Sequence, residues 1–359
     1  MSINKVNIED FLLLSRQHPV FDARSPGEYL HAHIPSAISL PLFSDEERAV
    51  VGTAYKQQSR KKAIKLGLDF FGLKMKKMVE EVEDYFSTIK QPQDGQIVLI
   101  HCWRGGMRSE AVAWLLDLYG FKVYTLAGGY KSYRNWVMKQ FDKEYQINIL
   151  GGYTGSGKTI VLEALHRTGH SVIDLEGLAN HKGSAFGALG EKPQPGQEMF
   201  ENLLAYKLFQ QQSTESAAQQ GIWLEDESQR IGIVNIPHPV WNRMRSSPIF
   251  FLDINFEIRL DYLVAQYGKY EREKLMDSIM RIQKRLGGLE TKNAVSSLSE
   301  NNIADCFRIL LHYYDKQYFK GLNNRSNLTS LLTIISSDTV DGTSNASLIK
   351  RTLESTIPV

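Results

Sequence analysis

The residues with the clearest capacity for chemistry are a cysteine, a glycine pair and two arginines in one short stretch. Cys102 follows the apolar run QIVLIH, and Ser109 and Glu110 suit the first turn of a helix. A loop between a strand and a helix directs backbone amides and the helix N-terminus at the sulfur, which favours the nucleophilic thiolate and binds anions. We therefore predict that Cys102 is catalytic and is surrounded by an anion-binding loop of Trp103, Arg104, Gly105, Gly106, Met107 and Arg108.

A second group of residues matches a phosphate-binding motif. The stretch GGYTGSGKT contains G-x-x-x-x-G-K-[ST] between a predicted strand and a predicted helix. Its glycines let several N–H groups face one phosphate, and the helix dipole adds positive potential there. The motif specifies a phosphate-bearing ligand without identifying it as ATP. The predicted phosphate-binding residues are Gly152, Thr154, Gly155, Ser156, Gly157, Lys158 and Thr159.

Acidic residues follow two predicted strands in the same half of the chain. SVIDLE ends near Asp174 and Glu176, and GIWLEDES contains Glu225, Asp226 and Glu227. An acid at the end of a strand beside a P-loop holds Mg²⁺ in many P-loop proteins. The candidates for such a role are Asp174, Glu176, Glu225 and Asp226, and a solvated acidic turn is the alternative. The cysteine and histidine spacing predicts no zinc site.

The elements that must position these residues alternate between strands and helices. Predicted strands lie in PVFDARS, HIPSAISLPL, QIVLIH and FKVYTLAGG, and then in INIL, SVIDLE, GIWLEDES and IFFLDI. Helical patterns separate them, including most of residues 44–89, and QPQDG is a predicted turn. This alternation predicts an α/β protein with parallel sheets. We expect a parallel-sheet domain over residues 1–140 and a P-loop α/β domain over residues 146–359.

The composition excludes several classes of protein. The 359 residues are 42 % hydrophobic and 23 % charged, with two cysteines, so neither a disulfide scaffold nor a wholly disordered chain is expected. We find no signal peptide and no apolar run of about 18 residues, which predicts a cytoplasmic protein without a membrane span. The net charge of +2 is uninformative, but a basic cluster lies within residues 56–77. A nucleic-acid contact and a solvated helix face explain it equally well, and its candidate contact residues are Lys56, Arg60, Lys61, Lys62 and Lys65.

Two longer stretches carry a family resemblance. FDARSPGEYLHAHIPSAISLPL resembles the N-terminal signature of rhodanese domains, and LAGGYKSYRNWV resembles their C-terminal signature. Five residues separate Cys102 from Arg108, as in the related cell-cycle phosphatases, where common rhodaneses have four. Together with GTAYKQQSRKKAIKLG, CWRGGMRS and the P-loop, these motifs make the chain similar to the tRNA 2-selenouridine synthase family over at least residues 10–260.

The resemblance implies an enzyme that acts on wobble 2-thiouridine of tRNA. In that family geranyl diphosphate is taken to alkylate the thiocarbonyl sulfur, and selenophosphate then supplies selenium, carried by the cysteine that matches Cys102. A selenophosphate-producing enzyme is an expected partner, Mg²⁺ a candidate cofactor, and Trp103 a candidate stacking partner for the base. Placing the diphosphate of geranyl diphosphate in the P-loop is our own hypothesis, and selenophosphate is the alternative ligand.

Three other functions remain open on the residues alone. One is a rhodanese-type sulfurtransferase fused to an ATP-dependent kinase-like domain. Another is a cysteine phosphatase, which the wide loop around Cys102 admits. The last is an RNA-binding module without catalysis.

Overall fold

The computed structural model describes residues 3–89, 96–212 and 220–356. The chain divides into two compact units, Met1–Lys139 and Gln140–Val359, and each is described by itself. The turn predicted at QPQDG, residues 91–95, lies outside the described residues. None of the described helices is long and apolar enough to cross a membrane.

The N-terminal unit is built on five parallel strands in the order β1-β5-β4-β2-β3. β4 is the central strand and pairs with both β5 and β2. The edge strand β1 was not expected, because NKV is too short to show an alternating pattern. The strands are β1 (Asn4–Val6), β2 (Val20–Asp22), β3 (Ile38–Ser39), β4 (Ile97–His101) and β5 (Lys122–Leu126).

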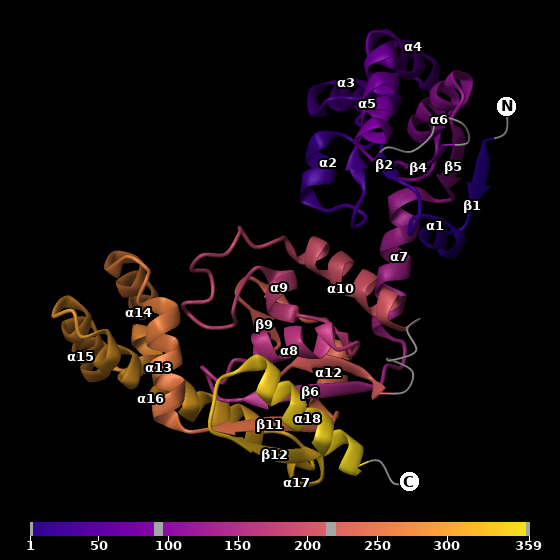
Figure 1. The fold of residues 1–359 in the computed structure, drawn as a ribbon. Coiled ribbons are helices and arrows are strands. Elements are labelled where there is room, and N and C mark those ends of the chain that lie inside the picture. The colour runs from indigo at the N-terminus through magenta and orange to yellow at the C-terminus, as the bar shows by residue number, and fades with distance from the viewer. Residues whose placement is uncertain (1–2, 90–95, 213–219, 357–359) are drawn as a thin grey trace. The chain divides into compact units, whose positions relative to one another are not determined.

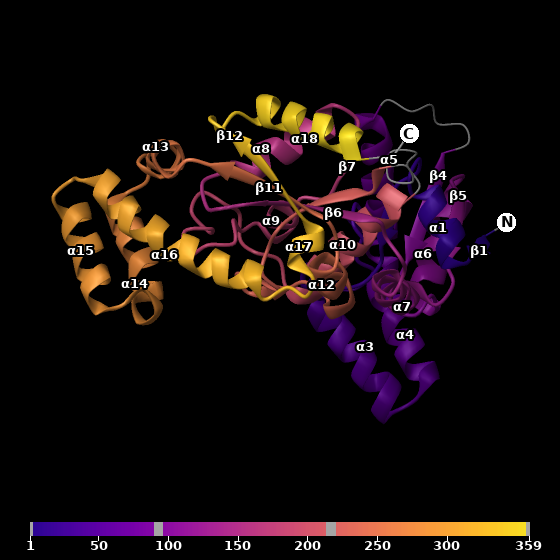
Figure 2. The same cartoon turned by 90° about the horizontal axis from the view of Figure 1, so that it is seen from below.

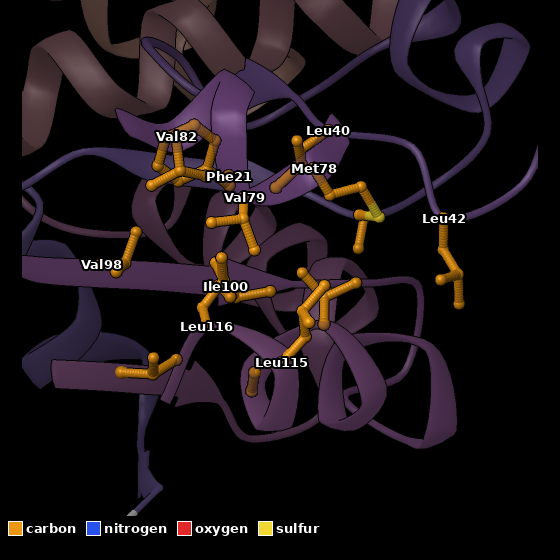
Figure 3. Close-up of a cluster of buried hydrophobic side chains, with 14 of the residues drawn as sticks. Phe21, Leu40, Leu42, Met78, Val79, Val82, Val98, Ile100, Leu115 and Leu116 are labelled. Atoms are coloured by element: carbon orange, nitrogen blue, oxygen red, sulfur yellow. The ribbon is translucent and has the colours of Figure 1, made fainter. Parts of the chain in front are cut away.

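Seven helices complete this unit in its described part: α1 (Ile8–Leu14), α2 (Pro26–His31), α3 (Asp45–Gln57), α4 (Arg60–Gly72), α5 (Met75–Thr88), α6 (Met107–Tyr119) and α7 (Gly129–Phe141). Ser44 begins α3 through a capping box with Glu47, and the Ser59 side chain caps α4. Helices α3 and α4 lie side by side (Figure 2). Buried apolar residues from β2, β4, α5 and α6 form the core, including Phe21, Ile100, Val82 and Leu116 (Figure 3).

The C-terminal unit contains a second parallel sheet, in the order β12-β11-β6-β8-β7. Its central strand β6 leads directly into the P-loop. β12 was not predicted from the sequence, whereas a strand at IFFLDI was. The strands are β6 (Ile147–Gly152), β7 (Ser171–Val172), β8 (Ile222–Glu225), β11 (Ile249–Ile254) and β12 (Leu332–Ser337), and β9 (Arg230–Ile231) and β10 (Val234–Asn235) form a separate hairpin.

Helices of the C-terminal unit fall into two groups (Figure 1). One group packs near the sheet: α8 (Lys158–Arg167), α9 (Leu175–Ala179), α10 (Gln197–Gln212), α12 (His238–Arg245), α17 (Leu328–Leu331) and α18 (Gly342–Thr356). The other is a helical group of α13 (Phe256–Tyr267), α14 (Arg272–Leu286), α15 (Gly288–Ser299) and α16 (Ile303–Asn323). Each group has its own buried apolar cluster, one centred on the sheet and one on the helical group.

The predicted strand SVIDLE is shorter than expected. Only Ser171–Val172 are strand, because the Asp174 carboxylate accepts a hydrogen bond from Gly177 N at 2.7 Å and begins helix α9. The α/β fold class with two parallel sheets is confirmed.

Candidate active site

The Cys102 loop is held by the start of helix α7. Tyr130 N donates to Cys102 O at 2.8 Å, and Lys131 N donates to Trp103 O at 3.0 Å. Gly105 and Gly129 have φ values of +61° and +59°. A Cβ on Gly129 would lie 2.3 Å from Cys102 O, so only glycine lets the two backbone segments approach so closely.

Cys102 is 3 % exposed, and its sulfur is contacted by the first turn of helix α6. Its Sγ lies 3.2 Å from Ser109 Oγ and 3.9 Å from Gly106 O. The Ser109 hydroxyl also donates to Gly106 O at 3.0 Å. The sequence suggested only a helix-start role for Ser109, and its position against the sulfur follows from the turn of the loop.

Arg108 does not contact the sulfur but binds a carboxylate. Its Nη1 donates to Glu28 Oε2 at 2.7 Å, and Arg48 Nε lies 3.0 Å from the same oxygen. Burial raises the pKa of Glu28, but the hydrogen bond and charge of Arg108 outweigh burial and lower it. Any anion that uses Arg108 must therefore compete with Glu28.

A cavity of about 440 Å³ adjoins the loop. Trp103 and Arg108 line it from the Cys102 side, and Glu28 and Arg48 line it from α2 and α3. Trp103 is 37 % exposed, and its ring lies 5.7 Å from that of Tyr130, so part of its side chain can contact a planar ligand. Among the other loop residues, the side chains of Arg104 and Met107 are exposed, and Gly106 is the N-cap of α6.

A buried ion pair contacts Tyr130, the residue whose backbone holds the Cys102 loop. Arg24 Nη2 lies 2.6 Å from Asp22 Oδ2, and both side chains are at most 1 % exposed. The Arg24 guanidinium stacks 3.8 Å from the Tyr130 ring, at the start of α7. Burial raises the pKa of Asp22, yet the charges of His101 and Arg24 bring it below its usual value. The pair was not expected as a support of the loop, because the sequence does not show which partners are buried together.

The P-loop connects β6 to α8, with left-handed glycines at its turns. Gly152, Gly155 and Gly157 have φ values of +148°, +84° and +73°, which other residues adopt only at a cost. Lys158 Nζ donates to Gly152 O at 3.2 Å, and Thr154 O accepts from Arg259 Nη1 at 3.0 Å. The Ser156 hydroxyl is buried without a hydrogen-bond partner among the described residues.

Asp226 stands apart from the other candidate acids for magnesium. Its carboxylate pairs with Arg325 Nη2 at 2.5 Å and accepts from the Tyr318 hydroxyl at 2.6 Å. The same hydroxyl accepts from Gly152 N at 3.2 Å. Asp226 therefore belongs to a buried network that fixes the start of the P-loop, and its oxygens are engaged there.

Glu176 and Glu225 are not part of the Asp226 network and lie beside Thr159. Thr159 Oγ1 donates to Glu176 Oε2 at 3.3 Å, and Glu176 N donates to Glu225 Oε1 at 2.6 Å. Glu225 Oε2 is buried without a partner among the described residues. Burial, reinforced by the charge of Glu176, raises the pKa of Glu227 well above its usual value, so Glu227 belongs to this group as well.

The oxygen atoms of Thr159, Glu176, Glu225 and Glu227 suit a hard cation only in part. No set of three or more His, Cys, Asp or Glu side chains in the described part of the chain is arranged to hold a metal ion. Mg²⁺ commonly takes one or two carboxylates and completes its shell with substrate phosphates and water. Thr159, Glu176 and Glu225 fit that incomplete donor set, and Asp174 serves as the cap of α9.

The basic cluster divides into paired and unpaired side chains. Lys74, Lys76 and Lys77 form ion pairs with Glu47, Glu80 and Glu81. No ion pair is found in the described residues for the exposed side chains of Lys56, Arg60, Lys61, Lys62 and Lys65, which lie at the end of α3 and on α4. Cys306 is buried in α16, and burial raises the pKa of its thiol to about 12, as is usual for a cysteine in an apolar core.

The comparisons with known proteins agree with the two units. Residues 8–135 match the rhodanese-like domain family, and residues 145–335 match the family described as the tRNA 2-selenouridine synthase AAA domain. A tRNA 2-selenouridine synthase from Sulfurovum sp. (strain NBC37-1) is 33 % identical over 84 % of this chain and 86 % of its own length. A protein of that name from Shewanella halifaxensis (strain HAW-EB4) is 34 % identical over 89 % of this chain and 93 % of its own length. The chain therefore belongs to the tRNA 2-selenouridine synthase family.

Proposed function

We propose that this protein converts wobble 2-thiouridine of tRNA into 2-selenouridine, with geranyl diphosphate and selenophosphate as co-substrates. The observation that carries the proposal is that a glycine-framed cysteine loop and a P-loop occur in one chain of this family. Each loop suits one step. The P-loop suits a diphosphate leaving group, and the Cys102 loop suits the chemistry of a chalcogen.

In the first step the sulfur on C2 of 2-thiouridine attacks C1 of the geranyl group. The C1–O bond breaks, inorganic diphosphate leaves, and the N3 proton is released. Lys158 and the amides of the P-loop stabilise the charge that develops on the leaving diphosphate. Mg²⁺ bound near Thr159, Glu176 and Glu225 would neutralise part of the same charge.

In the second step selenium replaces the geranylthio group, which leaves more readily than sulfide. The Cys102 thiolate attacks the selenium of selenophosphate, and the Se–P bond breaks with its electron pair on phosphorus, giving phosphite and a Cys102 perselenide. The perselenide attacks C2, and geranyl thiol leaves. A small thiol then cleaves the Se–S bond, which frees 2-selenouridine and leaves Cys102 in a mixed disulfide that a second thiol reduces.

The phosphorus product tests this carrier role. If selenophosphate attacked C2 directly, water would cleave the Se–P bond afterwards and phosphate would form without any thiol being consumed. Formation of phosphite, together with a requirement for thiol in the release of 2-selenouridine, would support Cys102 as the selenium carrier. Phosphate formed at an unchanged rate by Cys102→Ala would remove the carrier role and leave the overall conversion intact.

The tRNA is expected to contact the N-terminal unit through the exposed cations of α3 and α4. The cavity beside the Cys102 loop has a tryptophan ring and arginines, which suit a splayed base and its phosphate. A selenophosphate-producing enzyme is the expected partner. It would deliver the selenium donor directly to the Cys102 sulfur, which is buried.

The decisive experiment is mass analysis of nucleosides from 2-thiouridine tRNA incubated with the protein. Geranyl diphosphate alone should give S-geranyl-2-thiouridine, and both co-substrates should give 2-selenouridine. Cys102→Ala should retain the first product and lose the second, whereas Cys306→Ala should retain both. ATP turnover without RNA, or phosphoester hydrolysis that depends on Cys102, would instead favour the sulfurtransferase–kinase or the phosphatase alternative.

A further inference from the structure

We propose that the hydrocarbon chain of the prenyl diphosphate binds in an apolar pocket between the P-loop and the helical group. This inference rests on the proposed function, because it assumes that the P-loop holds a prenyl diphosphate. It adds a location for the chain, which neither the motifs nor the comparisons indicate.

The pocket begins at the P-loop and runs into the helical group. Thr154 is the residue that the P-loop contributes, and apart from Ser184 the remaining lining is apolar and aromatic. Among the residues that the structure describes, no charged side chain contributes to it. Its residues are Thr154, Ser184, Phe186, Leu263, Tyr267, Phe307, Leu310, Leu311 and Tyr314.

Helix α13 connects the pocket to the phosphate site. Arg259 donates to Thr154 O at 3.0 Å, and Leu263 lies one helical turn further along, on the same face. A Cβ built on Gly155 would lie 3.0 Å from Leu263 Cγ, so this leucine touches the P-loop itself. A ligand with its diphosphate in the loop therefore has an apolar wall within reach of its C1 carbon.

The pocket is closed by Phe186. Its enclosed volume is about 20 Å³, which is smaller than a ten-carbon chain needs. The Phe186 ring lies 5.6 Å from Phe307 and 5.8 Å from Tyr267, whose own rings stack 5.5 Å apart, so the three rings pack against one another at the pocket. Residues 180–196 contain neither helix nor strand, so this ring can move aside without breaking a regular element.

The chemistry of the lining favours a hydrocarbon over a nucleobase. A base would need buried donors and acceptors for its polar edge, whereas an isoprenoid chain needs only apolar and aromatic contact. The Tyr314 hydroxyl, one of the polar groups of the lining, already accepts from Ala185 N at 3.2 Å. Displacement of Phe186 by the chain exchanges one apolar occupant for another.

Leu263→Phe, with Leu286→Phe as the matched control, tests the location. Both leucines are 7 % exposed and belong to the same apolar cluster, but only Leu263 lines the pocket. Leu263→Phe should raise KM for geranyl diphosphate by about tenfold, the effect of excluding roughly two carbons from an apolar site. KM for the five-carbon dimethylallyl diphosphate should stay within about twofold for both variants.

Phe186→Ala tests the same pocket in the opposite direction and adds no bulk to the core. It should lower KM for the fifteen-carbon farnesyl diphosphate relative to that for geranyl diphosphate, because the ring that closes the pocket is gone. Inorganic diphosphate binding, measured by calorimetry, should be unchanged in all three variants. That result shows that the P-loop of each variant is intact.

The outcomes separate the two proposals. If the wild-type protein transfers no prenyl group to 2-thiouridine tRNA, the first step of the proposed function fails. If it does so and both Leu263→Phe and Phe186→Ala keep the wild-type chain-length preference, the pocket is not the chain site. A tenfold rise caused equally by Leu286→Phe also overturns the location.

Discussion

The Ser109 hydroxyl has two acceptors within reach, Gly106 O at 3.0 Å and Cys102 Sγ at 3.2 Å. When the thiol loses its proton, the hydroxyl can turn its hydrogen from the carbonyl to the sulfur. A hydrogen bond to a charged group contributes roughly 1.5–3 kcal/mol. The Ser109 hydroxyl is therefore placed to donate a hydrogen bond to a Cys102 thiolate.

We expect Ser109→Ala to slow alkylation of Cys102 by iodoacetamide at pH 7 by about tenfold, since the thiolate loses this donor. The rate is measured by quenching the reaction at successive times and following the alkylated Cys102 peptide by mass spectrometry. Ser109→Thr keeps the hydroxyl and should react within about twofold of wild type. Equal rates in wild type and Ser109→Ala would assign the serine to helix capping alone.

The buried pair of Asp22 and Arg24 predicts a pH dependence of stability. The pKa of Asp22 is lowered in the folded state from its ordinary value of 3.8, so the folded state binds this proton less readily than the unfolded state does. Its contribution is therefore complete above pH 3.8 and is lost as the pH falls through the lower, folded value. Asp22→Asn should cost about 3–5 kcal/mol at pH 7, because Arg24 is left buried and unpaired.

Denaturant titration at pH 7 and at decreasing pH measures this effect. The difference between wild type and Asp22→Asn should shrink in acid, where the wild-type carboxylate also becomes protonated. A difference that stays constant down to pH 3 would mean that packing, not charge, makes the pair important.

At this scale the sequence indicated the candidate groups but not the side chains that they contact. The residues of the Cys102 loop are contiguous in the sequence, and so are those of the P-loop, so local spacing was enough to propose each set. Glu28 lies 80 positions from Arg108, and a single sequence contains no signal for that pairing. Asp226 directly follows Glu225, the last residue of β8, and only the fold shows that Asp226 pairs with Arg325.

Among the elements, helix α7 and the Cys102 loop depend on Gly129. Gly129→Ala would place a Cβ 2.3 Å from Cys102 O and 2.5 Å from Gly105 N, at a φ of +59° that alanine tolerates poorly. We expect a loss of about 2–4 kcal/mol in the free energy of unfolding and a loss of selenation.

Gly72→Ala is the matched control for this prediction. A Cβ there meets nothing within 4 Å, and the residue lies in α4 of the same unit. Alanine favours a helix, so the control should be neutral or slightly stabilising. Chemical denaturation of both variants makes the comparison, and equal stability would contradict the close approach of the two loops.

Helix α16 reaches the P-loop through Tyr318. Its hydroxyl accepts from Gly152 N and donates to Asp226. Tyr318→Phe leaves both groups without that partner and should cost about 1–3 kcal/mol in stability. It should also weaken diphosphate binding, measured by calorimetry, whereas Tyr313→Phe on the same helix should not. Unchanged binding in Tyr318→Phe would show that the network has no role in shaping the loop.

The helices and strands that the sequence predicts well are those with a clear hydrophobic period or a helix cap. The helical stretch 44–89 was expected, and its first two segments begin where Ser44 and Ser59 supply caps. Strand β1 was missed because three residues carry no pattern, and SVIDLE was read too long because Asp174 caps a helix instead of extending the strand. Long periodic segments are therefore reliable, and short ones are decided by tertiary pairing.

Over the whole molecule, the net charge of +2 conceals the exposed cations at the end of α3 and on α4. If these bind tRNA phosphates, the triple substitution of Lys61, Lys62 and Lys65 by alanine should weaken tRNA binding. It should also reduce the slope of log K against log salt by about 2 to 3. Filter binding at several salt concentrations gives both quantities.

Lys76→Ala/Lys77→Ala is the control for the tRNA prediction, because these lysines already pair with Glu80 and Glu81. Its salt slope should remain close to that of wild type. An unchanged slope in the triple variant would return the cluster to its other interpretation, a solvated helix face.

The two apolar clusters of the C-terminal unit also have a consequence for its dynamics. Because one cluster holds the sheet with α8 and α18 and the other holds α13 to α16, the helical group can open sub-globally while the sheet stays folded. Amide hydrogen exchange should then occur in two blocks, with the helical group exchanging at the lower free energy. A ligand seated where the blocks meet would slow exchange in both, so exchange protection can report its occupancy without any turnover.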